Sequence, residues 1–278
     1  MRNKPSLQPL IYSSLLFVSL FFFADRVIGY YLNDLYSKQK KGEYYETSYA
    51  MSHVKEDVLI FGSSRAMRHY NPIILEDSLK LSTFNVGKPG NTLLYSEAAF
   101  SQILTYHKPK VVILDISPIE FADTERERGQ KSMIDVLLKY NDLPAIEQRI
   151  NNLDPKQLIL SKLFWTYKFN SSIYTMFHND HGKSKLNQLK GYKPLNGTKI
   201  KEDFVKIDNR DYVEDPLLVK TFRDFLDNAR KYNIPVHVVI SPTTLYHTHN
   251  SIATIKQITT RFGYDVIDVS HEPKFKKV

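Results

Sequence analysis

Two serines follow a short apolar run in the first quarter of the chain. The run VLIF at residues 58–61 ends at Gly62, and Ser63 and Ser64 come directly after it. A serine hydroxyl in such a place can act as a nucleophile if a base and oxyanion donors lie close to it. The same residues are common in turns, because Ser caps helices and Gly tolerates unusual backbone angles. Ser64 is therefore either a candidate nucleophile or a residue with a structural role in the turn.

Two further polar segments follow apolar runs. NVGKPGNT at residues 85–92 is rich in glycine, so its backbone amides can approach a ligand closely. Asp115 ends the apolar run VVILD, which makes it a better site candidate than most carboxylates of this chain. Its alternative role is that of a buried cap for a neighbouring loop amide. In a parallel sheet such strand ends meet at one edge, where ligands bind.

The rest of the chain supplies the elements that would position these groups. Apolar runs predict strands at 57–61, 82–87, 111–116, 234–241 and 264–269. Helical patterns lie between them, including one that opens at Pro72, one from Asn91, and one with Asp215 as its N-cap. This alternation predicts an α/β fold with a parallel sheet and helices on both faces. Residues 118–213 interrupt it and are read as a mostly helical insertion that covers one end of the sheet.

Taken together, the three strand ends resemble the SGNH/GDSL hydrolase superfamily. Gly62-Ser63-Ser64 is similar to its first block, in the variant of a membrane-anchored branch associated with polysaccharide and teichoic-acid acylation. Asn85, Gly87, Gly90 and Thr92 match its second block, which is the most specific match. The resemblance implies a three-layer, flavodoxin-like sheet. It also implies a nucleophilic Ser64 and an oxyanion held by the amides of Ser64 and Gly90.

The third and fourth blocks are less regular. The family expects an asparagine as an oxyanion donor where this chain has Ile119. Asp268 and His271 have the spacing of the family's Asp-x-x-His pair, which supplies the base and its orienting carboxylate. They directly follow a strand and stand close to Val278, whereas the family's pair usually comes later. The base is thus expected to be His271, or to belong to a pair in a segment beyond residue 278.

Several other side chains are weaker candidates. Arg65 and Asp115 are the candidates for substrate binding. His69, His247 and His249 are interpreted mainly as surface-loop histidines, and no metal site or cofactor is expected. Trp165 and Tyr167 could stack on sugar rings, although core packing is the commoner role of such residues.

The N-terminus predicts a membrane anchor. Residues 10–24 carry no charge, and a span from about residue 9 to 31 is long enough to cross a bilayer. Arg2 and Lys4 precede it, which favours a cytoplasmic N-terminus and an extracytoplasmic main domain. A cleaved signal peptide and a buried helix of a soluble protein are the alternatives. The expected organisation is an anchor at 1–32, a polar juxtamembrane stalk at 33–56, and an SGNH-like domain at 57–278.

Composition narrows the chemistry further. The 278-residue chain has no cysteine, which excludes disulfides and a thiol nucleophile, and its net charge of +8 favours anionic partners. The lysines are dispersed and no nucleic-acid motif is present, so a nucleic-acid partner is not expected.

The expected function is a membrane-anchored serine esterase or O-acyltransferase that acts on acyl esters of an envelope carbohydrate or wall polymer. A membrane-bound acyl-transfer partner would fit this role. The alternative is a non-catalytic envelope binding or assembly protein with the same fold.

Overall fold

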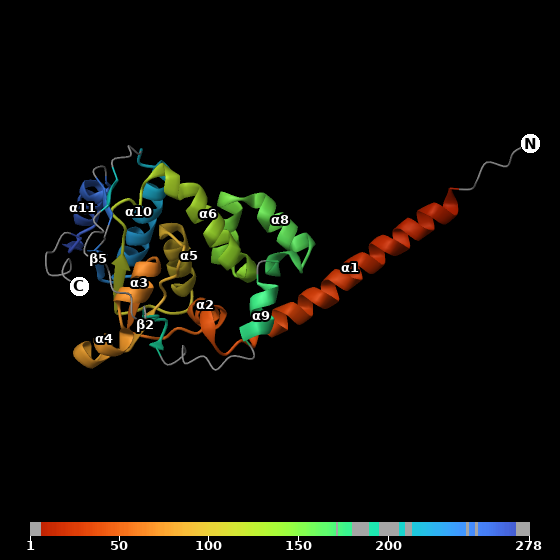
Figure 1. The fold of residues 1–278 in the computed structure, drawn as a ribbon, viewed down its shortest axis with the longest axis horizontal. Coiled ribbons are helices and arrows are strands. Elements are labelled where there is room, and N and C mark those ends of the chain that lie inside the picture. The colour runs from red at the N-terminus through yellow and green to blue at the C-terminus, as the bar shows by residue number, and fades with distance from the viewer. Residues whose placement is uncertain are drawn as a thin grey trace, which may run out of the picture.

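A five-stranded parallel sheet forms the centre of the protein in the computed structural model (Figure 1). The structure describes residues 7–170, 172–179, 189–194, 206–208, 213–242, 245–247 and 250–270. The strands, in spatial order, are β2 (Thr83–Asn85), β1 (Val58–Phe61), β3 (Val111–Asp115), β5 (Val236–Ile240) and β7 (Asp265–Asp268). Counted along the chain within this sheet, the order is 2-1-3-4-5. The predicted parallel α/β arrangement is therefore confirmed.

The larger core lies on one face of the sheet. It is covered by α5 (Leu93–Ile103), α10 (Pro216–Lys231) and α11 (Ile252–Arg261), whose apolar residues are buried. Phe61 of β1, Phe100 of α5 and Phe225 of α10 meet there, with ring centroids 4.6 to 5.5 Å apart. Alternate strand residues such as Phe61 point toward this face, so their side chains pack between the sheet and the helices.

Two short helices cover part of the opposite face. These are α3 (Ser64–His69) and α4 (Pro72–Leu79), which begins after the N-cap Asn71 as its Pro72 predicts. Asp115 follows Leu114, so the two side chains point to opposite faces, and Asp115 accepts a hydrogen bond from Tyr70 at the end of α3. Polar side chains from the end of α3 and the end of β3 consequently meet beneath α3.

The insertion is helical over much of its described length. It contains α6 (Asp123–Leu137), η1 (Leu138–Tyr140), α7 (Pro144–Leu153), α8 (Pro155–Leu163), η2 (Tyr167–Phe169) and α9 (Ile173–Asn179). These elements pack on α5 and reach the base of the N-terminal helix (green in Figure 1). A small parallel pair, β4 (Lys206–Asp208) with β6 (Leu245–His247), was not expected from the polar sequence around it.

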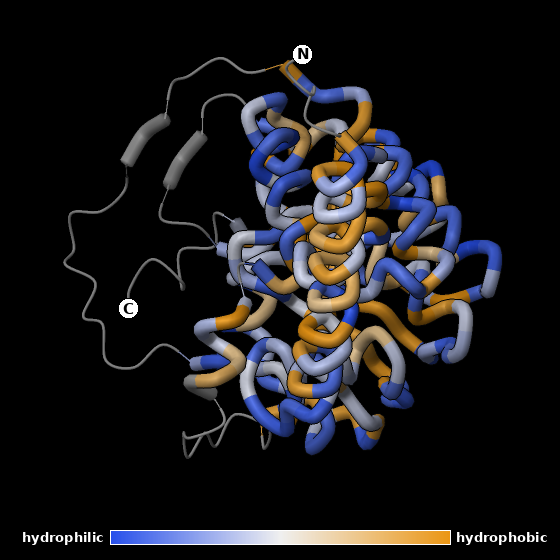
Figure 2. The backbone as a smooth tube through the Cα atoms, turned by 90° about the vertical axis from the view of Figure 1, so that its right-hand side faces the viewer, coloured by the Kyte–Doolittle hydropathy of each residue, from blue (hydrophilic) through white to orange (hydrophobic). Residues whose placement is uncertain are grey.

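The long helix α1 (Gln8–Ser37) extends from the domain and has the length and apolar composition needed to cross a membrane. Its apolar residues appear orange in the view along the helix in Figure 2. The end of α1 is part of the domain, because Leu32 and Tyr36 are buried in the main core.

The structure differs from the expected stalk at residues 33–56. This segment contains α2 (Gly42–Ser52), whose Ala50 and Met51 are buried against α5 together with Val54. The apolar stripe of α2 is narrow, and the residues on either side of it are polar or tyrosine. The sequence therefore shows little of the apolar periodicity that predicts a helix. The segment is a packed part of the fold.

Candidate active site

Ser64 is the first residue of α3, directly after the turn that ends β1. Gly62 has φ +140°, and a Cβ there would lie 2.6 Å from the carbonyl oxygen of Asp115, so only glycine fits. Ser63 is the helix cap, since its Oγ accepts a 3.4 Å hydrogen bond from the amide of Arg65. Ser64 is partly exposed, and its hydroxyl has no hydrogen bond to any described residue. The turn role therefore belongs to Gly62 and Ser63, and Ser64 is left available.

The glycine-rich loop after β2 runs alongside this turn. The amide of Lys88 donates to the carbonyl of Gly62 at 3.0 Å, which extends the pairing of β1 and β2 beyond the strands. A Cβ at Gly87 would lie 2.8 Å from the Cβ of Ala66, so the loop and α3 are in close contact. Gly90 has φ +72° with open space around it. The prediction that these two strand ends lie next to each other is confirmed by the pairing of β1 with β2.

Asn85 holds α3 in place. Its Nδ2 donates to the carbonyls of Ala66 at 2.8 Å and Tyr70 at 3.0 Å, and its Oδ1 accepts from the amide of Gly87 at 2.9 Å. The side chain is buried with both polar atoms bonded. Asn85 therefore fixes the geometry of the turn and the loop that flank Ser64.

Asp115 is the centre of a buried polar cluster below α3. The phenol of Tyr70 donates to Oδ2 at 2.8 Å, and the guanidinium of Arg65 lies 3.4 Å from Oδ1. Burial, together with Asp115, raises the pKa of Tyr70 well above its ordinary range. Desolvation lowers the pKa of His69, the last residue of α3, although the Asp115 carboxylate opposes this. Arg65 and Asp115, the two candidates for substrate binding, thus lie side by side and pair with each other.

Tyr70 and Glu120 were missed by the sequence interpretation. The buried Glu120 accepts from the amide of Leu93 at 2.7 Å and from that of Ser117 at 3.3 Å, next to Ile119. Burial raises the pKa of Glu120. The sequence signal that could have indicated Glu120 is its place directly after Ile119, where the family has its asparagine. This carboxylate binds the start of α5.

Asp268 lies at the far edge of the sheet. β7 is three strands from β1, which corresponds to about 14 Å. The Asp268 carboxylate accepts from the Ser270 hydroxyl at 2.7 Å and pairs with Lys256 of α11 at 2.8 Å. Burial raises its pKa, but these partners more than offset the effect and hold the pKa below its ordinary value. His271 and His249 lie outside the described residues, as does the His247 side chain, so a link from Asp268 through His271 to Ser64 stays a prediction.

A buried lysine connects the glycine-rich loop to α2. The Nζ of Lys88 lies 3.1 Å from the Thr47 hydroxyl and 3.4 Å from a Glu43 carboxylate oxygen. Burial lowers the pKa of Lys88, while Glu43 raises it. Sequence reasoning missed this link, because a lysine in a polar loop usually points to water. The loop that carries Gly90 is therefore tied to α2, the helix that follows α1 in the chain.

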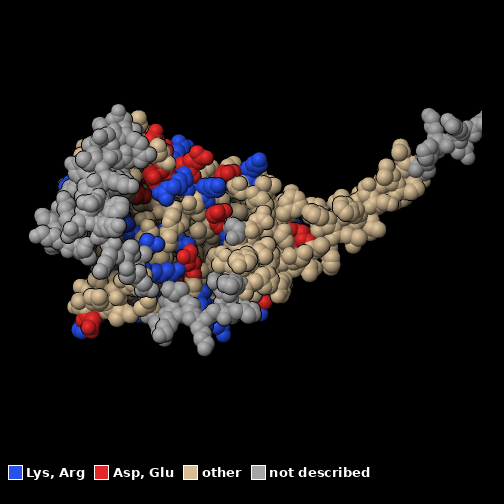
Figure 3. All heavy atoms as spheres, viewed as in Figure 1, with Lys and Arg blue, Asp and Glu red and all other residues tan. Residues whose placement is uncertain are grey.

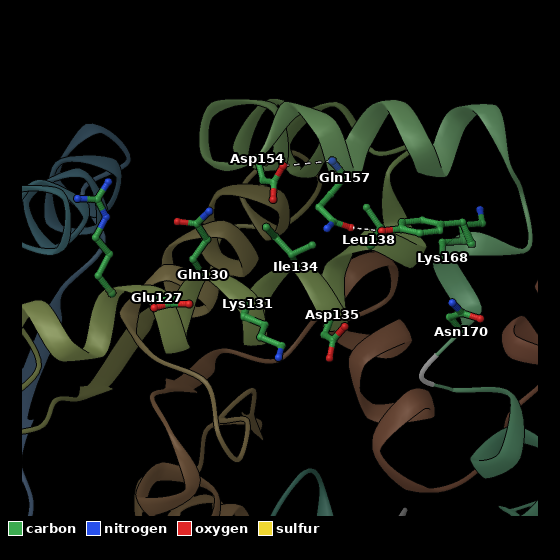
Figure 4. A pocket seen from close by; sticks show the side chains of 12 residues that line it. Glu127, Gln130, Lys131, Ile134, Asp135, Leu138, Asp154, Gln157, Lys168 and Asn170 are labelled. Carbon is green, nitrogen blue, oxygen red and sulfur yellow. Dashed lines mark hydrogen bonds between the residues drawn. The ribbon is translucent and has the colours of Figure 1, made fainter.

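A separate hollow of about 610 Å³ lies between α6 and the α8–η2 segment (Figure 4). Tyr167 lines it, and its hydroxyl donates to the Gln157 side chain at 2.7 Å. Trp165 is outside this hollow and packs against α1, with the Arg26 guanidinium 4.9 Å from its ring. The two aromatic residues considered for sugar stacking therefore have different surroundings. Within the described ranges, no three His, Asp or Glu side chains gather as a metal ion would require.

The fold and these strand ends define an α/β protein with a parallel five-stranded sheet and a long apolar N-terminal helix. The chain matches no family model, and a search of curated proteins finds no match either.

Proposed function

We propose that the protein is a membrane-anchored, extracytoplasmic serine esterase or O-acyltransferase of SGNH type that acts on acyl esters of a cell-envelope carbohydrate. The observation that carries this proposal is the setting of Ser64. Its hydroxyl is partly exposed while Ser63 caps the helix, and the loop of Gly87 and Gly90 is bonded to the turn beside it. A spare serine beside a glycine-rich loop provides a nucleophile and backbone amides for an oxyanion.

The topology supports the same class. The strand order 2-1-3-4-5 is that of flavodoxin-like doubly wound sheets, and such sheets bind ligands beyond the carboxyl ends of their strands. Ser64, Gly90 and Asp115 all lie at that edge. The order of the sheet and the position of the candidate nucleophile therefore agree.

The proposed reaction begins with attack of the Ser64 Oγ on the acyl carbonyl carbon. The base accepts the hydroxyl proton, and the amides of Ser64 and Gly90 hold the oxyanion. Collapse of the tetrahedral intermediate breaks the ester bond and leaves an acyl-serine. The base returns its proton to the oxygen of the departing alcohol. Water or a sugar hydroxyl then takes the acyl group, which gives hydrolysis or transfer. His271, oriented by Asp268, is the proposed base.

The charge of the chain and its first helix support the proposed anchoring and substrate class. Arg2 and Lys4 precede α1, and by the positive-inside rule they support a main domain outside the cytoplasm. A net charge of +8 attracts an anionic wall polymer as the acylated substrate. A membrane-bound partner that supplies the acyl group fits a transferase.

Ester turnover by the full chain in detergent tests this proposal. With p-nitrophenyl acetate as substrate, Ser64→Ala should lower kcat/KM by at least about 10³-fold. Ser63→Ala is the matched control: it should keep the turnover while it loses about 1 kcal/mol of stability, because only the helix cap is removed. Equal turnover by the wild type and Ser64→Ala would contradict a nucleophilic Ser64.

A non-catalytic envelope binding or assembly protein is the second candidate. One observation favours it: the carboxylate of Asp268, the group proposed to orient the base, is occupied by Lys256 and Ser270. In that case Ser64→Ala would bind an acylated wall carbohydrate as tightly as the wild type does, and neither protein would release its acyl groups.

A further inference from the structure

We infer that the surface formed by the end of α8, residues 164–166 and α9 lies in the bilayer interface on the domain's side and contacts lipid. This inference rests on the proposed role of α1 as the membrane anchor. It adds a second membrane contact, made by the helical insertion about 140 residues further along the chain.

The free length of α1 is too short to cross a bilayer. The N-cap Leu7 and residues 8–21 of α1 are exposed, and from Phe22 onward one side of the helix packs on the domain. Fifteen helical residues extend about 22 Å, whereas the hydrocarbon core is about 30 Å thick and needs about 20 residues. A span that starts at Leu7 therefore reaches about Arg26. The domain surface that contacts residues 22–26 must then lie at the membrane boundary.

Aromatic and polar contacts fix the insertion against this part of α1. The ring of Phe164 stacks on Phe22 with centroids 5.7 Å apart and lies edge-on to Phe21 at 6.1 Å. A Cβ at Gly29 would lie 2.4 Å from the Cβ of Trp165, so this glycine permits the close approach of the two backbones. Residues 164–166 are consequently held at the depth of α1 residues 21–29.

The charges of Asp25 and Arg26 in α1 are satisfied within this contact. Asp25 accepts hydrogen bonds from the amides of Trp165 at 2.8 Å and Thr166 at 3.1 Å, and from the Thr166 hydroxyl at 2.7 Å. Arg26 pairs with Asp25 at 2.7 Å and donates to the Leu163 carbonyl at 3.1 Å. Polar groups near the hydrocarbon region need partners inside the protein. The Asp25 and Arg26 pair meets that requirement through the insertion.

The surrounding surface exposes several large apolar side chains where it would meet lipid, and the charge of Lys162 beside them is paired with Glu147. Ile159 and Leu163, one helical turn apart on α8, are 63% and 44% exposed, and Trp165 is 41% exposed. α9 contacts α1 and exposes Phe177. The surface at the base of α1 is largely without charge in Figure 3, whereas charged side chains are frequent elsewhere on this view of the domain. Exposed apolar patches mark interaction sites, and tryptophan is enriched at membrane interfaces. Continuity with α1 identifies the lipid bilayer as the occupant.

Trp165 is the only tryptophan of the chain, so its fluorescence tests the inference directly. The full chain is reconstituted in phosphatidylcholine vesicles, with the domain outward, that contain lipids brominated near the headgroup or near the chain end. We expect blue-shifted emission, strong quenching by lipids brominated near the headgroup, and little quenching by aqueous iodide. The matched control is Trp165→Phe with Ile74→Trp on α4, which lies far from α1 in Figure 1 and is 63% exposed. That probe should be quenched by iodide and should not respond to the brominated lipids.

Flotation after carbonate washing separates the possible failures. If the chain floats with the vesicles and Trp165 behaves like the Ile74→Trp control, the lipid contact is wrong and the anchor stands. If the chain does not float, the anchor is wrong and the inference falls with it. Ester turnover at Ser64 is read independently of both results.

Discussion

Lys88 extends from the glycine-rich loop after β2 to α2, where its Nζ lies 3.1 Å from the Thr47 Oγ1. The Thr47 hydroxyl in turn donates to the Glu43 carbonyl at 2.7 Å. A buried ammonium needs such acceptors, because an unpaired charge in the interior is costly. The loop beside Ser64 and α2, the helix that follows α1, are therefore one connected unit.

Removal of the Thr47 hydroxyl should weaken this unit. Thr47→Val takes one acceptor from Lys88 at little change in volume, so we expect a loss of about 1–3 kcal/mol in the free energy of unfolding. Denaturant unfolding of the full chain in detergent measures it. Thr47→Ser keeps the hydroxyl and should stay closer to the wild type, and equal losses in the two variants would contradict the role of the hydroxyl.

Tyr70 and Asp115 should be energetically coupled. Tyr70→Phe leaves the more distant Arg65 as the partner of the buried carboxylate among the described residues, and we expect a loss of about 1–3 kcal/mol. Asp115→Asn should also destabilise the protein. A double-mutant cycle with denaturant unfolding measures the coupling, which should exceed about 0.5 kcal/mol for two groups in contact. Strict additivity of the two losses would show that the hydrogen bond adds no stability.

Gly62 should be far less tolerant of substitution than Gly263, although both have positive φ. Gly62→Ala combines backbone strain with a Cβ placed 2.6 Å from the Asp115 carbonyl oxygen. Gly263→Ala meets no atom within 4 Å, so it should cost only the conformational strain of about 1–2 kcal/mol. Thermal unfolding of the two variants in detergent compares these costs. A Gly62→Ala variant as stable as Gly263→Ala would mean that the β1 turn is looser than described.

Lys139 should make stability rise with pH in the alkaline range. Burial lowers the pKa of Lys139 to about 8, below its value of 10.5 when unfolded, although Asp135 opposes this. Between these two pKa values the unfolded chain binds a proton that the folded chain does not bind, so the free energy of unfolding increases from pH 8 toward 10.5. Below pH 8 the folded chain carries the buried charge, and its full cost lowers the stability. Lys139→Met should remove this increase and raise stability at pH 7 by on the order of 1–3 kcal/mol.

Unfolding measured from pH 7 to 10.5 checks the contribution of Lys139. The exposed Lys131→Met on the same insertion is the control and should leave the pH profile unchanged. A Lys139→Met profile that still rises like the wild type would assign the increase to other groups.

Much of the fold could be predicted because its patterns are local. The strands are continuous apolar runs, and the helix α10 begins where Asp215 and Pro216 predict it. The Asp215 carboxylate accepts from the amides of Leu217 at 2.8 Å and Leu218 at 3.2 Å. The proximity of the Ser64 turn and the glycine-rich loop followed from parallel pairing of neighbouring strands.

The parts that could not be predicted depend on contacts between distant segments. The packing of α2 in the core depends on α5, and Lys88 is buried only because Thr47 and Glu43 meet it from another helix. Asp25 and Arg26 lie beside each other in the sequence as charges at the end of an apolar span. Their actual partners, residues 163–166, are about 140 positions away, and no local pattern indicates them.

Covalent labelling of Ser64 tests the central claim most directly. The full chain in detergent is treated with a fluorophosphonate probe, and the modified residue is located by mass spectrometry. We predict one modification, on Ser64, that is absent in Ser64→Ala and retained in Ser63→Ala. A folded wild-type chain that takes up no probe, or equal labelling of Ser64→Ala, would contradict the assignment of Ser64 as the nucleophile.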